Sequence, residues 1–416
     1  DGGIGVQIEN DNIQELQVIS GTFNAEYGRA LTGVVNMVTK DGGNQFEGSL
    51  HTYAGDYQSS DKIYNNLNNL DLEDDYSVSA SLSGPILKDK VTFYSSGRVN
   101  QSKGWLNGLQ TFTIYGDTIF KDQNNNRYLD GNEEQKDPYY KGLNWHSSWS
   151  TQNKVTFNLL KGTTFKINTI LNSRESQDYN FALQLLEDAQ ITNFNRGRFL
   201  GLSISHTLSP TSFLQVNVSE NKYNYESYLF EDPLDNRYIT PDSLFLARLE
   251  NRIPDHIIEQ YGDQVQYFPA YSLYRAGVDN RRFERETKTN NYKLDFTSQI
   301  NKYNQVKLGL DFSSHSLMLD TYSLLDSTLT DQVYTPIIPD KESFTRSYYV
   351  RKPTEFAIYA QDKIEYGDMI INLGLRYESF NPNAKIPNNI HEPYIKDPRN
   401  PALDTLSTEE LENINW

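Results

Sequence analysis

Long segments in which apolar and polar residues alternate one by one constrain the fold of this chain more than any other feature. In one such segment Leu294 and Phe296 alternate with Lys293, Asp295 and Thr297. Successive side chains of a β-strand point to opposite faces, so the pattern predicts strands with one apolar and one polar face. Eleven segments are predicted strands, near residues 45–55, 76–84, 91–101, 148–160, 163–173, 197–208, 212–228, 287–301, 304–317, 354–365 and 369–380.

The lengths of these strands and of their connections point to a membrane barrel. Many match or exceed the roughly 9 to 11 residues that a tilted strand needs to cross a bilayer, whereas globular strands usually have about 5 to 6. Short turns, as at 161–162 and 302–303, alternate with long polar loops, as at 102–147 and 229–286. Outer-membrane barrels sort their loops in this way. An all-β transmembrane antiparallel barrel is therefore favoured over a soluble sandwich or propeller, for which no blade-length repeat is visible.

Composition excludes several other classes of protein. The chain of 416 residues has a formal net charge of -17, which argues against a nucleic-acid partner because phosphate binding needs clustered Lys and Arg. It contains no Cys, so disulfides and thiol chemistry have no part in it. No run approaches the roughly 18 apolar residues of a membrane helix. Aromatic residues at 13% are too frequent for a disordered chain.

One long loop has the ligand spacing of a calcium-binding loop. Counted from Asp122, oxygen-bearing side chains fall at positions 1, 3, 5, 9 and 12, and position 7 offers a backbone carbonyl. Position 6 is Arg127, where the helix-loop-helix version of such a loop has Gly. An Asx-rich turn without a metal is the alternative. We predict a structural calcium site whose ligands are Asp122, Asn124, Asn126, Tyr128, Asp130 and Glu133.

The sequence contains no motif that is typical of an enzyme. The six His residues are scattered without metal-ligand spacing, and no nucleophile elbow, zincin motif or phosphate-binding Gly loop is present. Helix signals occur in three of the long loops, at 180–188, 240–262 and 407–410. The protein is therefore not predicted to be an enzyme.

Several motifs in order resemble a known family. Residues 13–19, the segment Ala25-Glu-Tyr-Gly-Arg29 and the segment 33–40 resemble the end of the plug domain of TonB-dependent outer-membrane transporters. The Glu-Tyr-Gly-Arg form is most similar to the Oar-like branch, as is the turn at 83–90. The resemblance implies a barrel of 22 strands closed by a plug, so eleven strands make about half of one. We expect residues 1–44 to be the C-terminal part of the plug and residues 45–416 the first half of the barrel, with the remaining parts outside this chain.

The resemblance implies active transport across the outer membrane of a Gram-negative bacterium. The expected partners are the TonB-ExbB-ExbD energy-coupling complex, outer-membrane lipid and lipopolysaccharide, a surface lipoprotein and a solute of unknown identity, with a peptide-like one among the candidates. The alternative is a surface barrel that acts as an adhesin or as a platform for partner proteins. A passive porin is disfavoured because a porin needs no plug.

Three residues are expected to form the plug gate, namely Tyr27, Gly28 and Arg29. A buried guanidinium needs a carboxylate partner, so we expect one on a barrel strand for Arg29. Ordinary turn chemistry is the alternative for these residues. The alternation also assigns faces to the strands. Lipid should contact Val78, Leu82, Leu294, Phe296, Leu308, Leu310, Leu373 and Leu375, and the lumen should contain Lys293, Asp295, Asp311 and Arg376.

Overall fold

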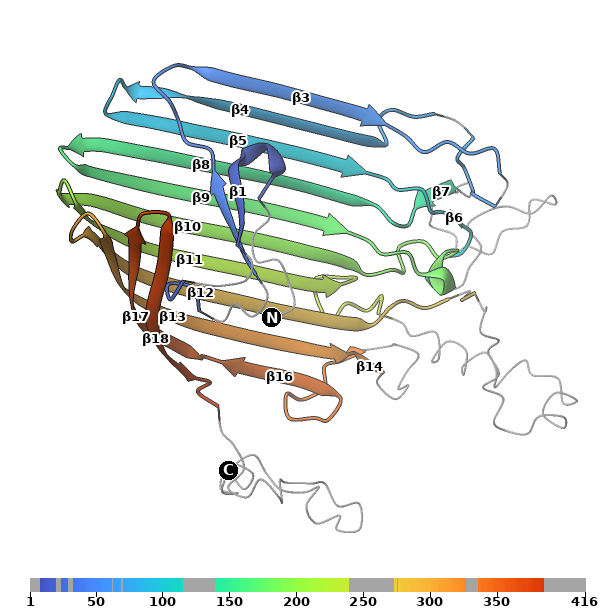
Figure 1. Ribbon diagram of the computed structural model, residues 1–416. Coiled ribbons are helices and arrows are strands. Elements are labelled where there is room, and N and C mark those ends of the chain that lie inside the picture. Colours follow the sequence, from blue (N-terminus) through green and yellow to red (C-terminus); the bar gives the residue numbers. More distant parts are fainter. Residues whose placement is uncertain are drawn as a thin grey trace, which may run out of the picture.

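The computed structural model describes residues 8–19, 24–28, 33–61, 63–68, 70–114, 139–238, 273–274, 276–326 and 336–384. A large, curved antiparallel sheet dominates this part of the chain, and a small two-stranded sheet lies against one of its faces (Figure 1). No helix in the described ranges is long and apolar enough to span a membrane.

The large sheet has 12 strands, and almost all of them pair with their neighbours in the sequence. Its strands are β3 (Glu47–Gly55), β4 (Asp75–Leu87), β5 (Val91–Ser102), β8 (His146–Leu160), β9 (Thr163–Ser176), β10 (Thr192–Ser209), β11 (Ser212–Tyr228), β12 (Arg281–Gln299), β13 (Asn304–Ser323), β16 (Arg346–Arg351), β17 (Thr354–Tyr366) and β18 (Met369–Asn381). All eleven predicted strands are present. The twelfth, β16, pairs with the far end of β13, and residues 352–353 separate it from β17.

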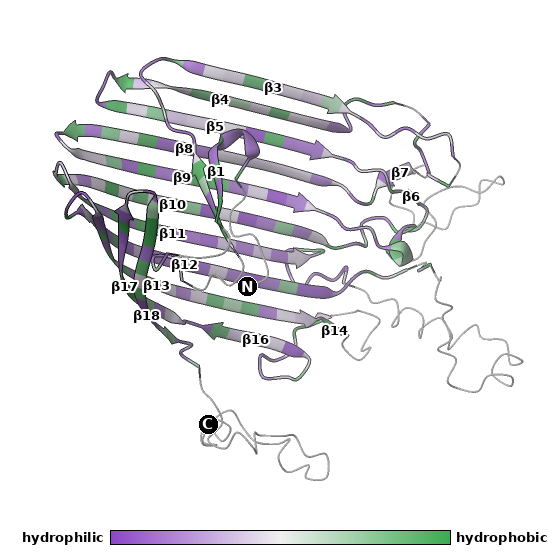
Figure 2. Ribbon diagram, viewed as in Figure 1, coloured by the Kyte–Doolittle hydropathy of each residue, from purple (hydrophilic) through white to green (hydrophobic). Residues whose placement is uncertain are grey.

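Hydrophilic and hydrophobic residues alternate along the strands of the sheet (Figure 2), so its two faces differ in chemistry, as predicted. Leu308 and Leu310, which are predicted to face lipid, are exposed on one face, and their partners Phe296 and Leu294 lie half-buried beside them. Lys293 and the other residues predicted to face the lumen lie on the opposite face. We call the apolar face outer and the polar face inner. The exposed members of the outer set are Val78, Leu82, Leu308, Leu310, Leu373 and Leu375.

Connections of different length lie at opposite ends of the strands (Figure 1). Two residues join β8 to β9 and β10 to β11, whereas the long connections all lie at the other end. Smaller elements occur at this long-loop end, namely β6 (Asn107–Gln110), β7 (Tyr139–Gly142), β14 (Leu325–Asp326), β15 (Pro336–Ile337) and the 3-10 helix η2 (Phe181–Leu183). Helix η2 coincides with the helix signal at 180–188, and Asn180 caps it. The signals at 240–262 and 407–410 lie outside the described residues.

The N-terminal segment, residues 8–44, crosses the inner face of the large sheet (Figure 1). It contains the 3-10 helix η1 (Asn10–Asn12) and the strands β1 (Ile13–Ile19) and β2 (Val34–Thr39), which pair antiparallel. Both strands lie within the segments 13–19 and 33–40 that resemble the plug of the transporter family. Several of their apolar side chains, including Leu16, Val18, Val35 and Met37, are exposed. A two-stranded sheet with such a surface is marginal by itself, so its attachments to the large sheet matter.

Candidate functional site

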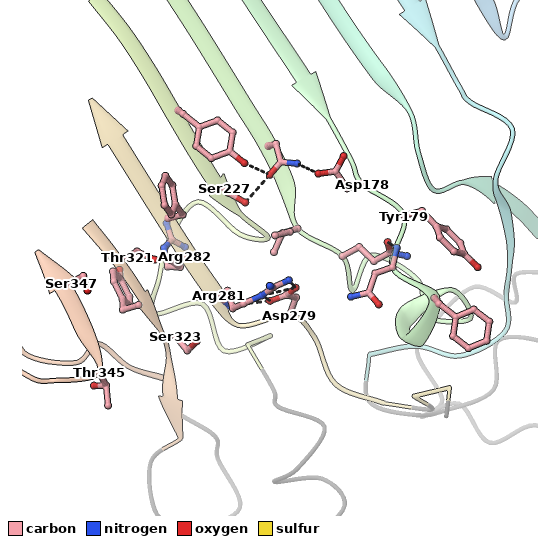
Figure 3. A pocket seen from close by; sticks show the side chains of 18 of the residues that line it. Asp178, Tyr179, Ser227, Asp279, Arg281, Arg282, Thr321, Ser323, Thr345 and Ser347 are labelled. Atoms are coloured by element: carbon pink, nitrogen blue, oxygen red, sulfur yellow. Dashed lines mark hydrogen bonds and ion pairs between the residues drawn. The ribbon is translucent and has the colours of Figure 1, made fainter. Parts of the chain in front are cut away.

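A cavity of about 810 Å³ opens at the long-loop end of the sheet (Figure 3). One side of it consists of inward residues of β10 to β13, among them Asn193, Ser227 and Thr321. The other side includes the loop residues 178–181 and Asp279. Strands and loops therefore enclose the cavity together.

Asn193 organises the strand side of this cavity. Its side-chain oxygen accepts hydrogen bonds from the hydroxyl of Tyr225 at 3.0 Å and from that of Ser227 at 2.8 Å. Its amide nitrogen donates to Asp178 at 3.0 Å, which ties the strand to the loop. Asn193 and Ser227 are buried, so this network is shielded from solvent and fixes the shape of the wall.

The charges of the cavity are largely balanced. The guanidinium of Arg281 donates through Nε and Nη2 to the carboxylate of Asp279, at 2.9 and 2.6 Å. Gln190 is buried and accepts from the backbone N–H of Asn180 at 3.1 Å. Its amide nitrogen has no hydrogen-bond partner among the described residues. The cavity thus presents amide, hydroxyl and aromatic groups rather than a concentrated charge.

A small apolar core supports the loops around the cavity. It joins Ile114, Leu183, Leu186 and Tyr238 with Val278 and neighbouring residues. The hydroxyl of Tyr238 donates to the carbonyl of Phe230 at 2.9 Å, so its polar end is satisfied. The described parts of several long loops therefore pack into one folded layer.

The N-terminal segment is attached to the inner face of the large sheet, which we call the wall. This attachment is most extensive near η1. The hydroxyl of Tyr94 on β5 donates to Asn12 at 2.9 Å in a buried contact. Arg98 on the same strand pairs with Glu9 at 2.6 Å and also with Asp11. Charge-assisted hydrogen bonds of this kind are stronger than neutral ones. This cluster anchors the start of the segment.

A second group of contacts holds the end of β2. Lys154 on β8 and Lys166 on β9 approach Asp41, at 3.0 and 2.7 Å, and Lys154 also donates to the carbonyl of Thr39 at 2.8 Å. Burial by itself would raise the pKa of Asp41, but the hydrogen bonds from both Lys residues outweigh it and hold the pKa below its usual value. The carboxylate is therefore charged where it binds the wall.

The turn at residues 24–28 makes a third, smaller contact, with β13 and β18. Glu26 pairs with Lys307 on β13, and the guanidinium of Arg376 on β18 donates to the carbonyls of Ala25 and Glu26, each at 3.4 Å. A Cβ added to Gly28 would lie 1.9 Å from the carboxylate of Glu378. A side chain at position 28 would therefore have to displace the ends of the Glu378 and Arg376 side chains. We call this contact the latch.

The wall behind the latch is itself a network of charged and aromatic groups. The hydroxyl of Tyr359 on β17 donates to Asp295 on β12, and both residues are buried. The guanidinium of Arg376 lies 5.6 Å from the centroid of the Tyr359 ring, in the range of a cation–π contact. In the turn itself, burial and the charge of Glu26 raise the pKa of Tyr27. Tyr27 is therefore a neutral hydrogen-bonding group at physiological pH.

Comparison with known proteins identifies this architecture. No model of a protein family matches the chain. The TonB-dependent transporter Oar of Myxococcus xanthus is 34% identical over 92 residues, which are 20% of this chain and 8% of Oar. The structure of the outer membrane transporter YddB from Escherichia coli is similar with a TM-score of 0.58 and 12% identity, over 91% of this chain and 44% of YddB. The ferric citrate transporter FecA gives a TM-score of 0.53 and 12% identity, over 90% and 44%.

The chain has the fold of a TonB-dependent outer-membrane transporter. It spans less than half the length of the transporters that it matches in structure. The large sheet accordingly has the architecture of one part of an outer-membrane barrel, although it is not closed in this chain. The relatives are transporters and receptors rather than enzymes, in agreement with the sequence.

The structure describes only some of the residues that the sequence predicts as site residues. Tyr27 and Gly28 lie in the latch, half-buried against the wall. Arg29 lies outside the described residues, so its expected carboxylate partner stays a prediction. The predicted calcium ligands Asp122, Asn124, Asn126, Tyr128, Asp130 and Glu133 also lie outside them. Among the described residues no group of three or more His, Asp or Glu side chains could hold a metal ion.

The sequence alone did not identify the residues of the large sheet that hold the latch. The alternation only places Lys307 on the polar face, and it assigns Arg376 to the lumen without a partner, whereas both contact the turn at residues 24–28. Their inward position in β13 and β18 is the signal that could have identified them, because a charged side chain on a lumenal face needs a partner there. Glu26 supplies that partner for Lys307, so the residue that the N-terminal segment contributes to the ion pair is an acid.

Proposed function

We propose that this chain is part of a TonB-dependent transporter that takes up a large or scarce solute through a plugged barrel. In this proposal residues 1–44 are the C-terminal part of the plug, and residues 45–416 are the first half of the barrel. The observation that carries it is the N-terminal segment on the inner face, tied to the wall on both sides of its β1–β2 sheet. The exposed apolar residues of β1 and β2 support a plug with further parts that pack on them.

The attachments of the plug are unequal, which suits a gate. The anchor near η1 and Asp41 includes two Lys residues, one Arg and a buried hydrogen bond, whereas the latch has one ion pair and two long hydrogen bonds. Force on the plug would release the weaker contact first. We therefore assign gating to the latch, with Tyr27, Gly28 and Arg29 in the moving turn.

The cavity at the long-loop end supports a solute that binds by hydrogen bonds and aromatic contacts. Binding sites of this type combine apolar rings with a few well-placed polar groups. Here the buried amide of Gln190 and the charge-balanced Arg281 favour a polar solute over a strongly charged one. We propose this cavity as the entry site, with a peptide-like solute among the candidates.

The remaining partners follow from the same proposal. TonB, with ExbB and ExbD, would supply energy from the inner membrane, and a surface lipoprotein would cover the loops. Lipid and lipopolysaccharide would surround the outer face. Calcium at residues 122–133 would stabilise one loop, and its only support is the spacing of the oxygen ligands. The alternative of an adhesin has no support among the relatives.

Labelling of a single cysteine separates transport from adhesion. This chain contains no Cys, so Ala25→Cys in the whole protein, freed of any other Cys, places a single thiol in the latch and keeps the Glu26–Lys307 ion pair. Its reaction with maleimide in cells should rise when TonB is energised and fall when an ionophore collapses the proton gradient. Lys302→Cys, in an exposed short turn, should react equally in both states. Labelling at position 25 that does not depend on the proton gradient would favour a static plug.

A further inference from the structure

A patch of polar side chains interrupts the apolar outer face of the sheet on strands β5, β8 and β9. Asn153 on β8 stands directly opposite Ser95 on β5 and Thr169 on β9. Gly97 and Thr151 stand opposite each other beside this row, on the side of the long loops. Their neighbours in the sequence on β5 and β8 contact the N-terminal segment on the inner face, so these five residues lie on the outer face. We call them the polar patch.

The polar patch lies at a depth where another part of the sheet presents an exposed leucine. Gly97, Thr169 and Leu310 each lie six residues from the short-turn ends of β5, β9 and β13. Asn153 lies seven residues from the corresponding end of β8. The outward band of a membrane barrel is normally apolar at this level, so the polar groups are inside the hydrocarbon zone. Apolar residues precede and follow the patch on all three strands, namely Phe93, Val99, Trp149, Val155, Ile167 and Leu171.

Hydrogen bonds within the polar patch leave part of its capacity unused. The hydroxyl of Ser95 donates to the side-chain oxygen of Asn153 at 2.6 Å, and the amide nitrogen of Asn153 donates to the hydroxyl of Thr151 at 3.3 Å. An Asn side chain has two N–H donors, so one of them has no partner among the described residues. A polar group without a partner is costly in hydrocarbon. Lipid tails offer no partner, whereas a second protein surface does.

We propose that two copies of this protein associate side by side in the outer membrane through the polar patch. Two copies related by a two-fold axis normal to the bilayer bring every residue opposite residues of its own depth, so the patch meets an identical patch. The patch has no charged residue, and its amide and hydroxyl groups both donate and accept hydrogen bonds. It is therefore complementary to itself, whereas a charged patch would repel its copy.

Gly97 allows the two outer faces to approach closely. It is exposed, and a Cβ at this position would meet no atom nearer than the carbonyl oxygen of Ser150 at 3.7 Å. Because Gly97 and Asn153 lie on neighbouring strands at similar depth, the two-fold axis places Asn153 of one copy over Gly97 of the other. Small residues and interchain hydrogen bonds drive association within membranes, where apolar surface alone does not. The inference requires the membrane placement of the sheet but not transport.

Association of the whole protein in lipid tests this proposal. Fluorescently labelled protein is reconstituted in phosphatidylcholine vesicles at a series of protein-to-lipid ratios, and the copies in each spot are counted by single-molecule photobleaching. Wild type should change from single copies to pairs as its density rises. Asn153→Leu should raise the dissociation constant of the pair about tenfold, which corresponds to about 1.4 kcal/mol. The matched control is Asn290→Leu, an outward position on β12 away from the patch, which should associate as wild type does.

Cross-linking in isolated outer membranes identifies the partner and does not depend on the Leu variants. In the whole protein, freed of any other Cys, Thr151→Cys should be joined to a second copy by a short bis-methanethiosulfonate. Leu310→Cys, at a similar depth on β13, should remain single. Wild type that stays single at every density, equal association of Asn153→Leu and wild type, or a cross-link from position 151 only to a different protein would each overturn the proposal.

Discussion

The carboxylate of Glu26 forms an ion pair with the ammonium group of Lys307, a residue 281 positions further along the chain. Both side chains are mostly buried, at 15 and 22% exposed. This single pair joins the turn of the N-terminal segment to strand β13. Under the proposed function, this pair would set how easily the plug can leave the wall.

Removal of the ion pair should loosen the turn. Exposed ion pairs contribute about 0 to 1 kcal/mol, and loss of one partner from a buried pair costs about 3 to 5 kcal/mol. We expect Lys307→Ala to lie between these limits, at about 1 to 2 kcal/mol. Hydrogen exchange at the N–H of Tyr27, which donates to Asn24 at 3.0 Å, should accelerate about tenfold or more.

The matched control for this substitution is Lys363→Ala, because Lys363 pairs with Glu365 in a much more exposed position. Hydrogen exchange at the N–H of Tyr27 should be as slow in this control variant as in wild type. Cells with Lys307→Ala should also admit large antibiotics while the barrel still inserts. Unchanged exchange and permeability in Lys307→Ala would remove the latch from the gating proposal.

Acid should weaken the attachment at Asp41. The pKa of its carboxyl is lowered in the folded protein, so this contact contributes stability above the unfolded value of about 3.9 and loses it as pH falls through the lowered folded pKa. Hydrogen exchange of residues 39–41, corrected for the intrinsic pH effect, should show this loss below about pH 4. In Asp41→Asn the protection should be weaker and should no longer depend on pH in that range.

Spin labels test the assignment of the two faces. Labels at Leu308 and Leu310 should collide with oxygen in the lipid, and labels at Asp311 and Ser313 should collide with a water-soluble relaxant. The reason is that adjacent residues of one strand point to opposite faces. Water-accessible labels at both Leu positions would exclude a lipid-facing outer surface.

Calcium binding at the loop 122–133 remains a prediction from spacing alone. Calorimetry on the whole protein should detect a site with a dissociation constant of roughly 0.1 to 1 mM, the range of extracellular modules. Asp122→Ala should abolish it, whereas Asp61→Ala in another long loop should leave it unchanged. A heat signal that persists in Asp122→Ala would place any calcium elsewhere.

Local patterns predict the strands because alternation and turn residues are read from neighbours in the sequence. Strand β11 begins and ends where predicted, at Ser212–Tyr228. The long-loop ends were underestimated, since β12 begins at Arg281 rather than near 287 and β13 continues to Ser323. The added end of β12 is rich in charged residues, and that of β13 starts with the apolar run 317–319, so the alternation stops in both while the backbone pairing continues.

Contacts between distant parts of the chain could not be predicted in the same way. The alternation places Lys307 on the inner face, but nothing local to it specifies Glu26 as its partner. The cavity wall likewise depends on Asn193, which joins Tyr225 and Ser227 to the loop at Asp178. Such contacts follow from the register of several strands and the packing of loops, which one sequence segment does not encode.

Cross-linking between the latch and the wall tests the central claim most directly, namely that residues 8–44 lie inside the barrel. The whole protein with Glu26→Cys and Lys307→Cys is treated with a short bismaleimide in isolated outer membranes and digested between the two sites. The two fragments should remain joined, and they should separate in the control with Glu26→Cys and Leu308→Cys, because Leu308 faces outward. Fragments that separate in the first variant, with both thiols shown to be reactive, would contradict a plug held against this wall.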